Sequence, residues 1–180
     1  MYIKFFKRFL DIIFSFLLII LLLPFLLITM IITILHLGFP IFDIRFPREG
    51  KNKKPFYMLK FRTRVYDTDN LWGRKTKLSN LIDKLKLNEL PQLFNILKGD
   101  MSFVGPRPFI CNETLPKGKI SPKRYCVRPG VTGLFQVSKK TTHKEKLKCD
   151  EEYYDNISFW LDLRILIKTP FSIIKKFIKK

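Results

Sequence analysis

The stretch IIFSFLLIILLLPFLLITMIITIL, residues 12–35, is apolar except for one serine, one proline and two threonines. A helix of this length extends about 36 Å, which is enough to cross a hydrocarbon core of about 30 Å. No Asp, Glu, Lys or Arg occurs in residues 12–42. We expect no polar face over these two dozen residues, which argues against the buried helix of a soluble protein. The segment therefore predicts a membrane-embedded helix.

Pro24 lies at the midpoint of this segment, and proline kinks or breaks a helix because it lacks a backbone donor. Lys4, Lys7 and Arg8 precede the segment, and five Lys and Arg residues follow it within residues 45–54. The positive-inside rule places both groups on the cytosolic side of a membrane. A helix bent at the proline, entering and leaving by the same face, satisfies both groups. A spanning helix with a tolerated kink is the alternative, and these features alone leave the two readings open.

The whole chain carries 34 Lys and Arg against 15 Asp and Glu, a net charge of +19. This excess predicts an anionic partner, which can be nucleic acid, lipid head groups or a phosphorylated substrate. Nine of the eighteen phenylalanines lie in residues 1–46, around the apolar segment, and no nucleic-acid-binding signature is present. We therefore expect no nucleic-acid partner.

Several elements of the remaining chain are predicted from spacing. Residues 54–62 resemble a strand that would place Lys60 and Arg62 on one face. Apolar residues at helical spacing predict a helix over 78–85, and residues 143–169 also look helical.

A basic amphipathic segment suited to a membrane surface is predicted after Pro170, where apolar residues alternate with lysines up to the last residue. A frayed basic tail is the alternative there.

The stretch LNELPQLFNILKGD, which starts at Leu87, predicts a helix over 89–98. Asn88 suits the N-cap, and Glu89 then falls at the first helical position, where its charge favours the dipole. Gly99 is typical of a helix C-terminus. The N-terminus of this helix would offer free N–H groups to an anion, and Glu89 beside it is a candidate Mg²⁺ ligand.

Arg107 lies between Pro106 and Pro108 in a stiff GPRP loop, so its guanidinium would be held ready for a phosphate or carboxylate. Arg128 has a similar neighbourhood in an Arg-Pro-Gly sequence, and Lys60 and Arg62 add further cations. These features together suggest a site for a phosphate diester or diphosphate with Mg²⁺. The basic residues could equally hold the domain against anionic lipid.

Five stretches of the chain together resemble the bacterial sugar transferase family, the small monotopic phosphoglycosyl transferases. The most specific is NELPQLFNILKGDMSFVGPRP, residues 88–108. The others, in order along the chain, are KRFLD (7–11), KFR (60–62), VRPGVTGLFQV (127–137) and WLDLRILIKT (160–169).

The resemblance implies that a sugar-1-phosphate is transferred from a nucleotide diphosphate sugar, a UDP-sugar, to polyprenyl phosphate with the help of Mg²⁺. This would begin polysaccharide or glycoconjugate synthesis on the cytosolic face of the bacterial cytoplasmic membrane. The resemblance also implies a re-entrant helix bent at Pro24, and it assigns Asp150 to the site. Anionic membrane lipid is the partner that the basic charge predicts, and a second copy of the chain or downstream glycosyltransferases are further candidate partners.

One residue departs from the pattern in a chemically important way. The family has an Asp-Glu dyad whose Asp attacks phosphorus, whereas this chain has Asn88 followed by Glu89. A neutral amide is a poor nucleophile. Three possibilities stay open: Glu89 attacks instead, the transfer is direct between the two substrates, or the chain is an inactive paralogue that binds polyprenyl phosphate, nucleotide sugar or a partner transferase.

The sequence and the resemblance together predict an α/β fold, mostly helical. Residues 1–42 would form a membrane-embedded re-entrant helix, and residues 43–180 a compact cytosolic catalytic domain. Glu89 and Asn88 are the predicted catalytic residues, and Glu89 is also the predicted metal ligand. The predicted substrate-binding residues are Arg107, Pro106, Pro108, Lys60, Arg62, Arg128 and Asp150.

Overall fold

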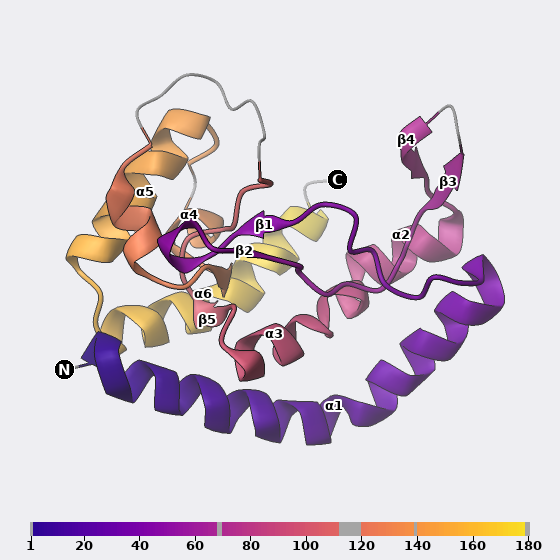
Figure 1. Ribbon diagram of the computed structural model, residues 1–180, viewed down its shortest axis with the longest axis horizontal. Helices are drawn as coiled ribbons and strands as arrows, with labels where there is room; N and C mark the ends of the chain where they lie inside the picture. Colours follow the sequence, from indigo (N-terminus) through magenta and orange to yellow (C-terminus); the bar gives the residue numbers. More distant parts are fainter. Residues whose placement is uncertain (1, 68–69, 112–119, 139, 179–180) are drawn as a thin grey trace.

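The computed structural model describes residues 2–67, 70–111, 120–138 and 140–178. One long helix, α1 (Lys7–Leu37), curves along one side of the molecule, and the other elements lie on its concave side (Figure 1). Helices predominate and the strands are short, so the expectation of a mostly helical α/β fold is confirmed.

The helical elements besides α1 are η1 (Tyr2–Phe6), η2 (Lys51–Lys53), α2 (Lys77–Lys84), η3 (Leu87–Glu89), α3 (Gln92–Lys98), η4 (Pro122–Cys126), α4 (Leu134–Val137), α5 (His143–Asp155) and α6 (Phe159–Ile178). The strands are β1 (Arg48–Glu49), β2 (Pro55–Phe56), β3 (Val65–Asp67), β4 (Asn70–Arg74), β5 (Ser102–Val104) and β6 (Gly130–Thr132). They form three two-stranded sheets, in which β1 pairs with β2 and β3 with β4 antiparallel, and β5 pairs with β6 parallel.

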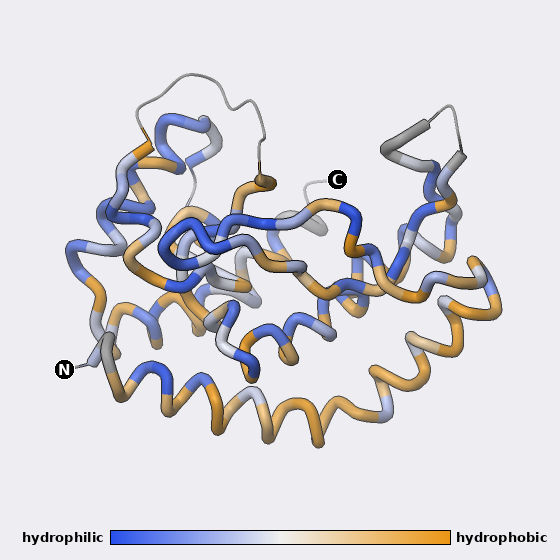
Figure 2. Tube along the Cα trace, viewed as in Figure 1, coloured by the Kyte–Doolittle hydropathy of each residue, from blue (hydrophilic) through white to orange (hydrophobic). Residues whose placement is uncertain are grey.

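The α1 helix is hydrophobic along most of its length (Figure 2). Only 17% of its most apolar window is buried, so α1 is not the core helix of a soluble protein, and it is long and apolar enough to cross a membrane. Side chains that are exposed on it include Phe9, Phe16, Leu17, Ile20, Leu21, Phe25, Ile28, Ile31 and Leu35. This surface indicates a membrane-bound protein.

The inner face of α1 is more polar than we expected from the sequence. Ser15, Thr29 and Thr33 are all buried there. Each hydroxyl donates to a carbonyl of its own helix, with Oγ1 of Thr33 2.8 Å from the Thr29 carbonyl oxygen. The expectation that no polar face exists is therefore wrong, because backbone hydrogen bonds allow these hydroxyls to lie against the domain.

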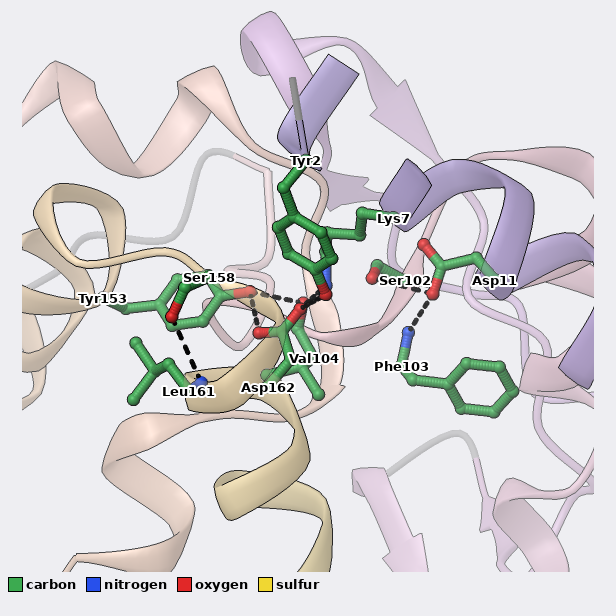
Figure 3. Close-up of polar contacts among 10 residues, drawn as sticks. All are labelled: Tyr2, Lys7, Asp11, Ser102, Phe103, Val104, Tyr153, Ser158, Leu161 and Asp162. Atoms are coloured by element: carbon green, nitrogen blue, oxygen red, sulfur yellow. Dashed lines mark hydrogen bonds and ion pairs between the residues drawn. The ribbon is translucent and has the colours of Figure 1, made fainter. Parts of the chain in front are cut away.

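Both ends of α1 are attached to the same domain. At the N-terminal end, Nζ of Lys7 lies 2.5 Å from a carboxylate oxygen of Asp162 on α6, and both side chains are buried (Figure 3). At the C-terminal end, Arg62 donates to the carbonyls of Leu37 and Gly38. Pro24 lies inside α1, and the helix continues through it.

Two apolar clusters form the core. The first contains Phe56, Met58, Leu93, Ile96 and Met101, and α1 covers it with partly buried leucine and isoleucine side chains. The second joins β5 to α5 and α6 through Val104, Val127, Tyr153 and Ile165. The α1 helix is therefore part of the packed structure, and the first cluster lies between it and the rest of the domain.

The helix predicted over 78–85 is confirmed as α2, and the strand predicted over 54–62 is wrong in extent. Regular pairing stops after Phe56, and only Phe61 makes a further isolated bridge, to Phe42. The backbone between these residues instead bonds to the side chain of Asn95. The N–H of Leu59 donates to the amide oxygen of Asn95.

The helix predicted over 143–169 is present but divided. It breaks at Asn156, and α6 then runs through Pro170 to Ile178, past the point where we expected it to end. Phe171 and Ile174 are exposed on this last part, as a surface segment requires. The side chains of residues 176–180 lie outside the described part of the chain, so the amphipathic character of the predicted tail stays a prediction.

Candidate active site

The Asn88–Glu89 turn has a different local structure from the one we predicted. It forms the 3₁₀ turn η3, and α3 begins only at Gln92 with Pro91 as its N-cap, so the predicted helix start at Glu89 is wrong. The N–H of Glu89 is bonded to the Lys86 carbonyl at 3.1 Å. The expectation that this N–H is free for an anion is therefore also wrong. The predicted helix end at Gly99 is confirmed, with φ 102°.

Asn88 is buried in this turn, and its carbonyl accepts a hydrogen bond from the N–H of Phe61 at 3.0 Å. Its side-chain oxygen is buried and has no hydrogen-bond partner among the described residues. Glu89, next to it, has a carboxylate about one-fifth exposed that pairs with Lys86 at 3.2 Å. The dyad position therefore holds one partly exposed carboxylate, paired with Lys86, and one buried, unpartnered amide oxygen.

Glu89 lines a small pocket together with three cations, which are Lys60, Arg48 and Arg107. Burial lowers the pKa of the Lys60 ammonium, the Glu89 carboxylate opposes this shift, and the two guanidiniums add to it. Crowded cations around a single carboxylate form a site whose charge an anionic ligand would compensate. Lys60, Glu89, Arg107 and Pro108 are thus brought together as the sequence predicted, whereas Arg48 was missed.

The loop that carries Arg107 is fixed by a close crossing of two backbone segments. Gly105 donates to the Thr132 carbonyl, and Gly130 donates to the Pro106 carbonyl. A side chain at Gly130 would place its Cβ 2.1 Å from the backbone nitrogen of Gly105, so no other residue fits there. Arg107 is exposed while its two proline neighbours are buried, which presents its side chain to the pocket on a rigid backbone.

Asp150 lies behind this loop and does not line the pocket. Its buried carboxylate is 3.6 Å from the guanidinium of Arg124, which in turn donates to the Arg107 carbonyl at 2.7 Å. Arg124 also lies over the Phe109 ring, 3.5 Å from its centroid. Burial raises the pKa of Asp150 to about 6, although Arg124 favours its charged form. Among the described residues, Asp150 therefore contacts the site through Arg124, which the sequence did not single out.

The remaining predicted cations occupy helix ends. Arg62 binds the last carbonyls of α1, and Nε of Arg128 donates to the Gly99 carbonyl at the end of α3 at 2.8 Å. Cations are stabilising at these positions because helix C-termini carry partial negative charge. Neither residue lines the pocket that contains Glu89. Their predicted role in substrate binding stays a prediction.

The fit of a divalent cation can be judged from the donor set. No group of three or more His, Cys, Asp or Glu that could hold a metal exists among the described residues. Mg²⁺ does not need such a group, because one or two carboxylates, waters and substrate phosphates usually bind it. Glu89 lines the pocket and is a suitable oxygen donor for that kind of site, whereas the unpartnered oxygen of Asn88 is buried and Asn88 does not line the pocket.

Comparison with known proteins identifies the family of the chain. The family model described as bacterial sugar transferase matches residues 2–176. The chain is 39% identical to the uncharacterized sugar transferase EpsL of Bacillus subtilis, over 78% of this chain and 73% of that protein. It is also 33% identical to an undecaprenyl-phosphate galactose phosphotransferase of Salmonella typhimurium, over 72% of this chain and 32% of that protein.

A third relative is the UDP-glucose:undecaprenyl-phosphate glucose-1-phosphate transferase of Xanthomonas campestris, 34% identical over 75% of this chain and 32% of that protein. The chain thus spans about a third of the length of the last two relatives. The family match covers nearly all of the chain, including the Glu89 pocket and α1. The chain belongs to the bacterial sugar transferase family.

Proposed function

We propose that the chain transfers a sugar-1-phosphate from a UDP-sugar to polyprenyl phosphate, with release of UMP. The observation that carries the proposal is the pocket in which Glu89 faces Lys60, Arg48 and Arg107. One carboxylate among three cations suits a metal-assisted diphosphate site better than a structural ion pair. The relatives whose names specify undecaprenyl phosphate and a sugar phosphate support the same substrates.

The three cations have a clear electrostatic role in such a reaction. Charge on the transferred phosphoryl group and on the leaving UMP is spread over several oxygens, and fixed positive groups lower the barrier without reorganising. Arg107 offers a planar fork of N–H donors to two phosphate oxygens. The partly buried environment of Lys60 strengthens its attraction for a phosphate because water screens it less.

Glu89 is the residue that would hold Mg²⁺ in this pocket, together with the phosphate oxygens of the substrate. When bound, the cation would neutralise diphosphate charge and polarise the phosphorus. Glu89 is also the only carboxylate among the described residues that line the pocket. Its substitution therefore tests both roles that we assign to it.

The sugar phosphate could be transferred by either of two routes. In the direct route an oxygen of polyprenyl phosphate attacks the sugar-linked phosphorus, the bond to the bridging oxygen breaks, and UMP leaves with that oxygen. In the second route the Glu89 carboxylate attacks that phosphorus first and UMP leaves with the bridging oxygen. An oxygen of polyprenyl phosphate then attacks the same phosphorus and displaces the carboxylate. Intact-protein mass spectrometry with UDP-sugar alone separates them, since only the second route adds a phosphosugar to the chain.

Assays of UMP release test the function. Purified protein would be given Mg²⁺, polyprenyl phosphate and a panel of UDP-sugars, and wild type compared with Glu89→Gln and Asn88→Asp. We expect wild type to release UMP with at least one sugar and Glu89→Gln to lose at least about 100-fold of the rate. A wild type that is inert on the whole panel, while Asn88→Asp turns over, would contradict the proposal.

That contradictory result would favour a second candidate function, a non-catalytic paralogue that binds polyprenyl phosphate, nucleotide sugar or a partner transferase. The observation behind it is Asn88, an amide at the position where the resemblance implies a nucleophilic carboxylate. Its buried, unpartnered oxygen gives no sign of a compensating group. Such a protein would keep the cationic pocket for binding and need no nucleophile.

We further propose that α1 is re-entrant and that the pocket opens at the cytosolic face of the bacterial cytoplasmic membrane. The attachment of both ends of α1 to one domain supports this, because a straight span would put Lys7 and Gly38 on opposite sides. Anionic lipid would then face the basic surface of the domain. Thiol labelling of cysteines introduced at Phe5 and Phe46 tests it, and labelling of the two from opposite sides would contradict it.

A further inference from the structure

A second cavity is lined by more cations than carboxylates. Lys7, Arg8, Lys51 and Arg128 line it, and Asp11 is the only carboxylate among its lining residues. It adjoins the first pocket along the chain segment that leads into β6, since Val127 and Arg128 line the second cavity and Gly130 and Val131 line the first. The two cavities share no lining residue.

The two guanidiniums in this cavity are held in place by neutral groups. The two terminal nitrogens of Arg8 lie 2.5 and 2.8 Å from the carbonyl oxygens of Ile96 and Leu97, and Nε of Arg128 donates to the Gly99 carbonyl. Carbonyls at a helix end position a guanidinium but supply only partial charge. Each arginine has five N–H donors, so both keep donors for another acceptor.

The two remaining charges near α1 are already engaged (Figure 3). Lys7 pairs with Asp162 at 2.5 Å. A carboxylate oxygen of Asp11 accepts from the Ser102 hydroxyl at 3.1 Å and from the Phe103 N–H at 3.2 Å, and the residue is buried. Asp11 is thus a structural acceptor for β5 and only partly offsets the positive charge beside it.

Lys51 completes the cavity from the η2 turn. Its side chain is exposed, and its ammonium has no hydrogen bond or ion pair with any residue that the structure describes. Arg8, Arg128 and Lys51 therefore line one cavity with Asp11, whose carboxylate is already bonded elsewhere. The Asp100 carboxylate also acts on Arg8, but it lies outside the lining and pairs with Lys98. An acceptor with two or more oxygens and at least one negative charge would satisfy all three.

We propose that this cavity is a second phosphate-binding site, separate from the Glu89 pocket, and that it holds the phosphate head group of a membrane lipid. Its position argues for a lipid source, because Lys7 and Arg8 form the first turn of α1, immediately before the apolar segment. Cations at that depth lie at the level of lipid head groups. The inference uses the proposed membrane placement of α1 and is independent of catalysis.

The test measures phosphate binding without turnover, on full-length protein in detergent that carries Arg107→Gln to weaken the first pocket. The probes are inorganic phosphate, farnesyl phosphate and a short-chain phosphatidylglycerol, each titrated by calorimetry. Lys51→Glu is the variant, and Lys54→Glu is the matched control, since Lys54 is an exposed lysine close in sequence that does not line the cavity. Circular dichroism checks that both remain folded.

We expect a lipid phosphate to bind more tightly than inorganic phosphate, and Lys51→Glu to weaken its binding by about 10-fold. Lys54→Glu should change it less than about 2-fold. Equal effects of the two substitutions, or no effect of Lys51→Glu, would overturn the site, and tighter binding of inorganic phosphate than of either lipid would overturn the lipid source. An inert result in UMP release would leave these expectations unchanged, so the two proposals fail separately.

Discussion

Two sets of cations in this chain have similar sequence surroundings and different structural positions. Lys60 and Arg107 line a pocket with the carboxylate of Glu89, where burial and neighbouring positive charge lower the pKa of Lys60. Arg62 and Arg128 donate to backbone carbonyls at the ends of α1 and α3. We refer to these as the pocket cations and the helix-end cations. The difference indicates that a strongly basic chain can use part of its charge to hold its own helices in place.

The largest expected effect concerns a buried cation outside the pocket, Lys7. Lys7→Met leaves the Asp162 carboxylate buried without its cation, which costs about 3–5 kcal/mol of unfolding free energy. Lys123→Met is the control, because it breaks an exposed pair with Asp155 and should leave the unfolding midpoint nearly unchanged. Thermal unfolding in detergent measures both. Equal shifts would show that the attachment of α1 does not depend on the buried pair.

The next effect is a pH dependence behind the pocket cations. The pKa of Asp150 is about 6 in the folded chain and about 4 when unfolded, so the folded state binds more protons between these values. The unfolding free energy should therefore fall as pH rises from about 4 to about 6, by up to about 3 kcal/mol. Asp150→Asn should flatten this slope in denaturant titrations at several pH values. An unchanged slope would show that Asp150 does not cause it.

Substitution of a pocket cation should change catalysis and leave stability intact. Arg107→Gln is expected to lower the rate of UMP release about 100-fold, because a fixed donor to transition-state charge is lost. Its unfolding midpoint should stay within experimental error of wild type, since the Arg107 side chain is exposed. A large fall in the midpoint would place Arg107 with the helix-end cations.

Substitution of a helix-end cation should lower stability and leave catalysis unchanged, and this is the smallest of the four expected effects. Arg62→Lys keeps the charge but loses the fork that reaches the Leu37 and Gly38 carbonyls, which costs about 1–2 kcal/mol. The KM for the nucleotide sugar should not change. A raised KM with an unchanged unfolding midpoint would instead move Arg62 into the substrate site, as the sequence analysis expected.

Local signals in the sequence were sufficient for several elements of the fold. The uncharged segment identified α1, the leucine spacing identified α2, and Gly99 identified the end of α3. Errors arose where a contact remote in sequence decides the structure. The strand predicted over 54–62 stops early because Asn95 supplies its hydrogen bonds, and the start of α3 moves to Gln92 after the 3₁₀ turn η3.

Local signals in the sequence also identified part of the candidate site. Lys60, Glu89 and Arg107 stand in distinctive local sequences, and the fold brings them into one pocket. Arg124 was missed because its contact with Arg107 spans 17 residues, and the Ser-Pro start of its own turn does not point to that contact. Arg48 was missed because nothing in a two-residue strand marks it. Long-range packing decides both positions, and no local pattern encodes it.

The central claim is that Glu89 and the pocket cations act on a sugar phosphate. The most direct measurement is transfer of radiolabelled sugar phosphate from UDP-sugar into an organic phase that contains polyprenyl phosphate and Mg²⁺. Our account predicts label in the lipid fraction with wild type, its loss by at least about 100-fold with Glu89→Gln, and little change with Arg62→Lys. Label that stays in the aqueous phase for every sugar tested, with protein that is folded and binds the nucleotide sugar, would contradict it.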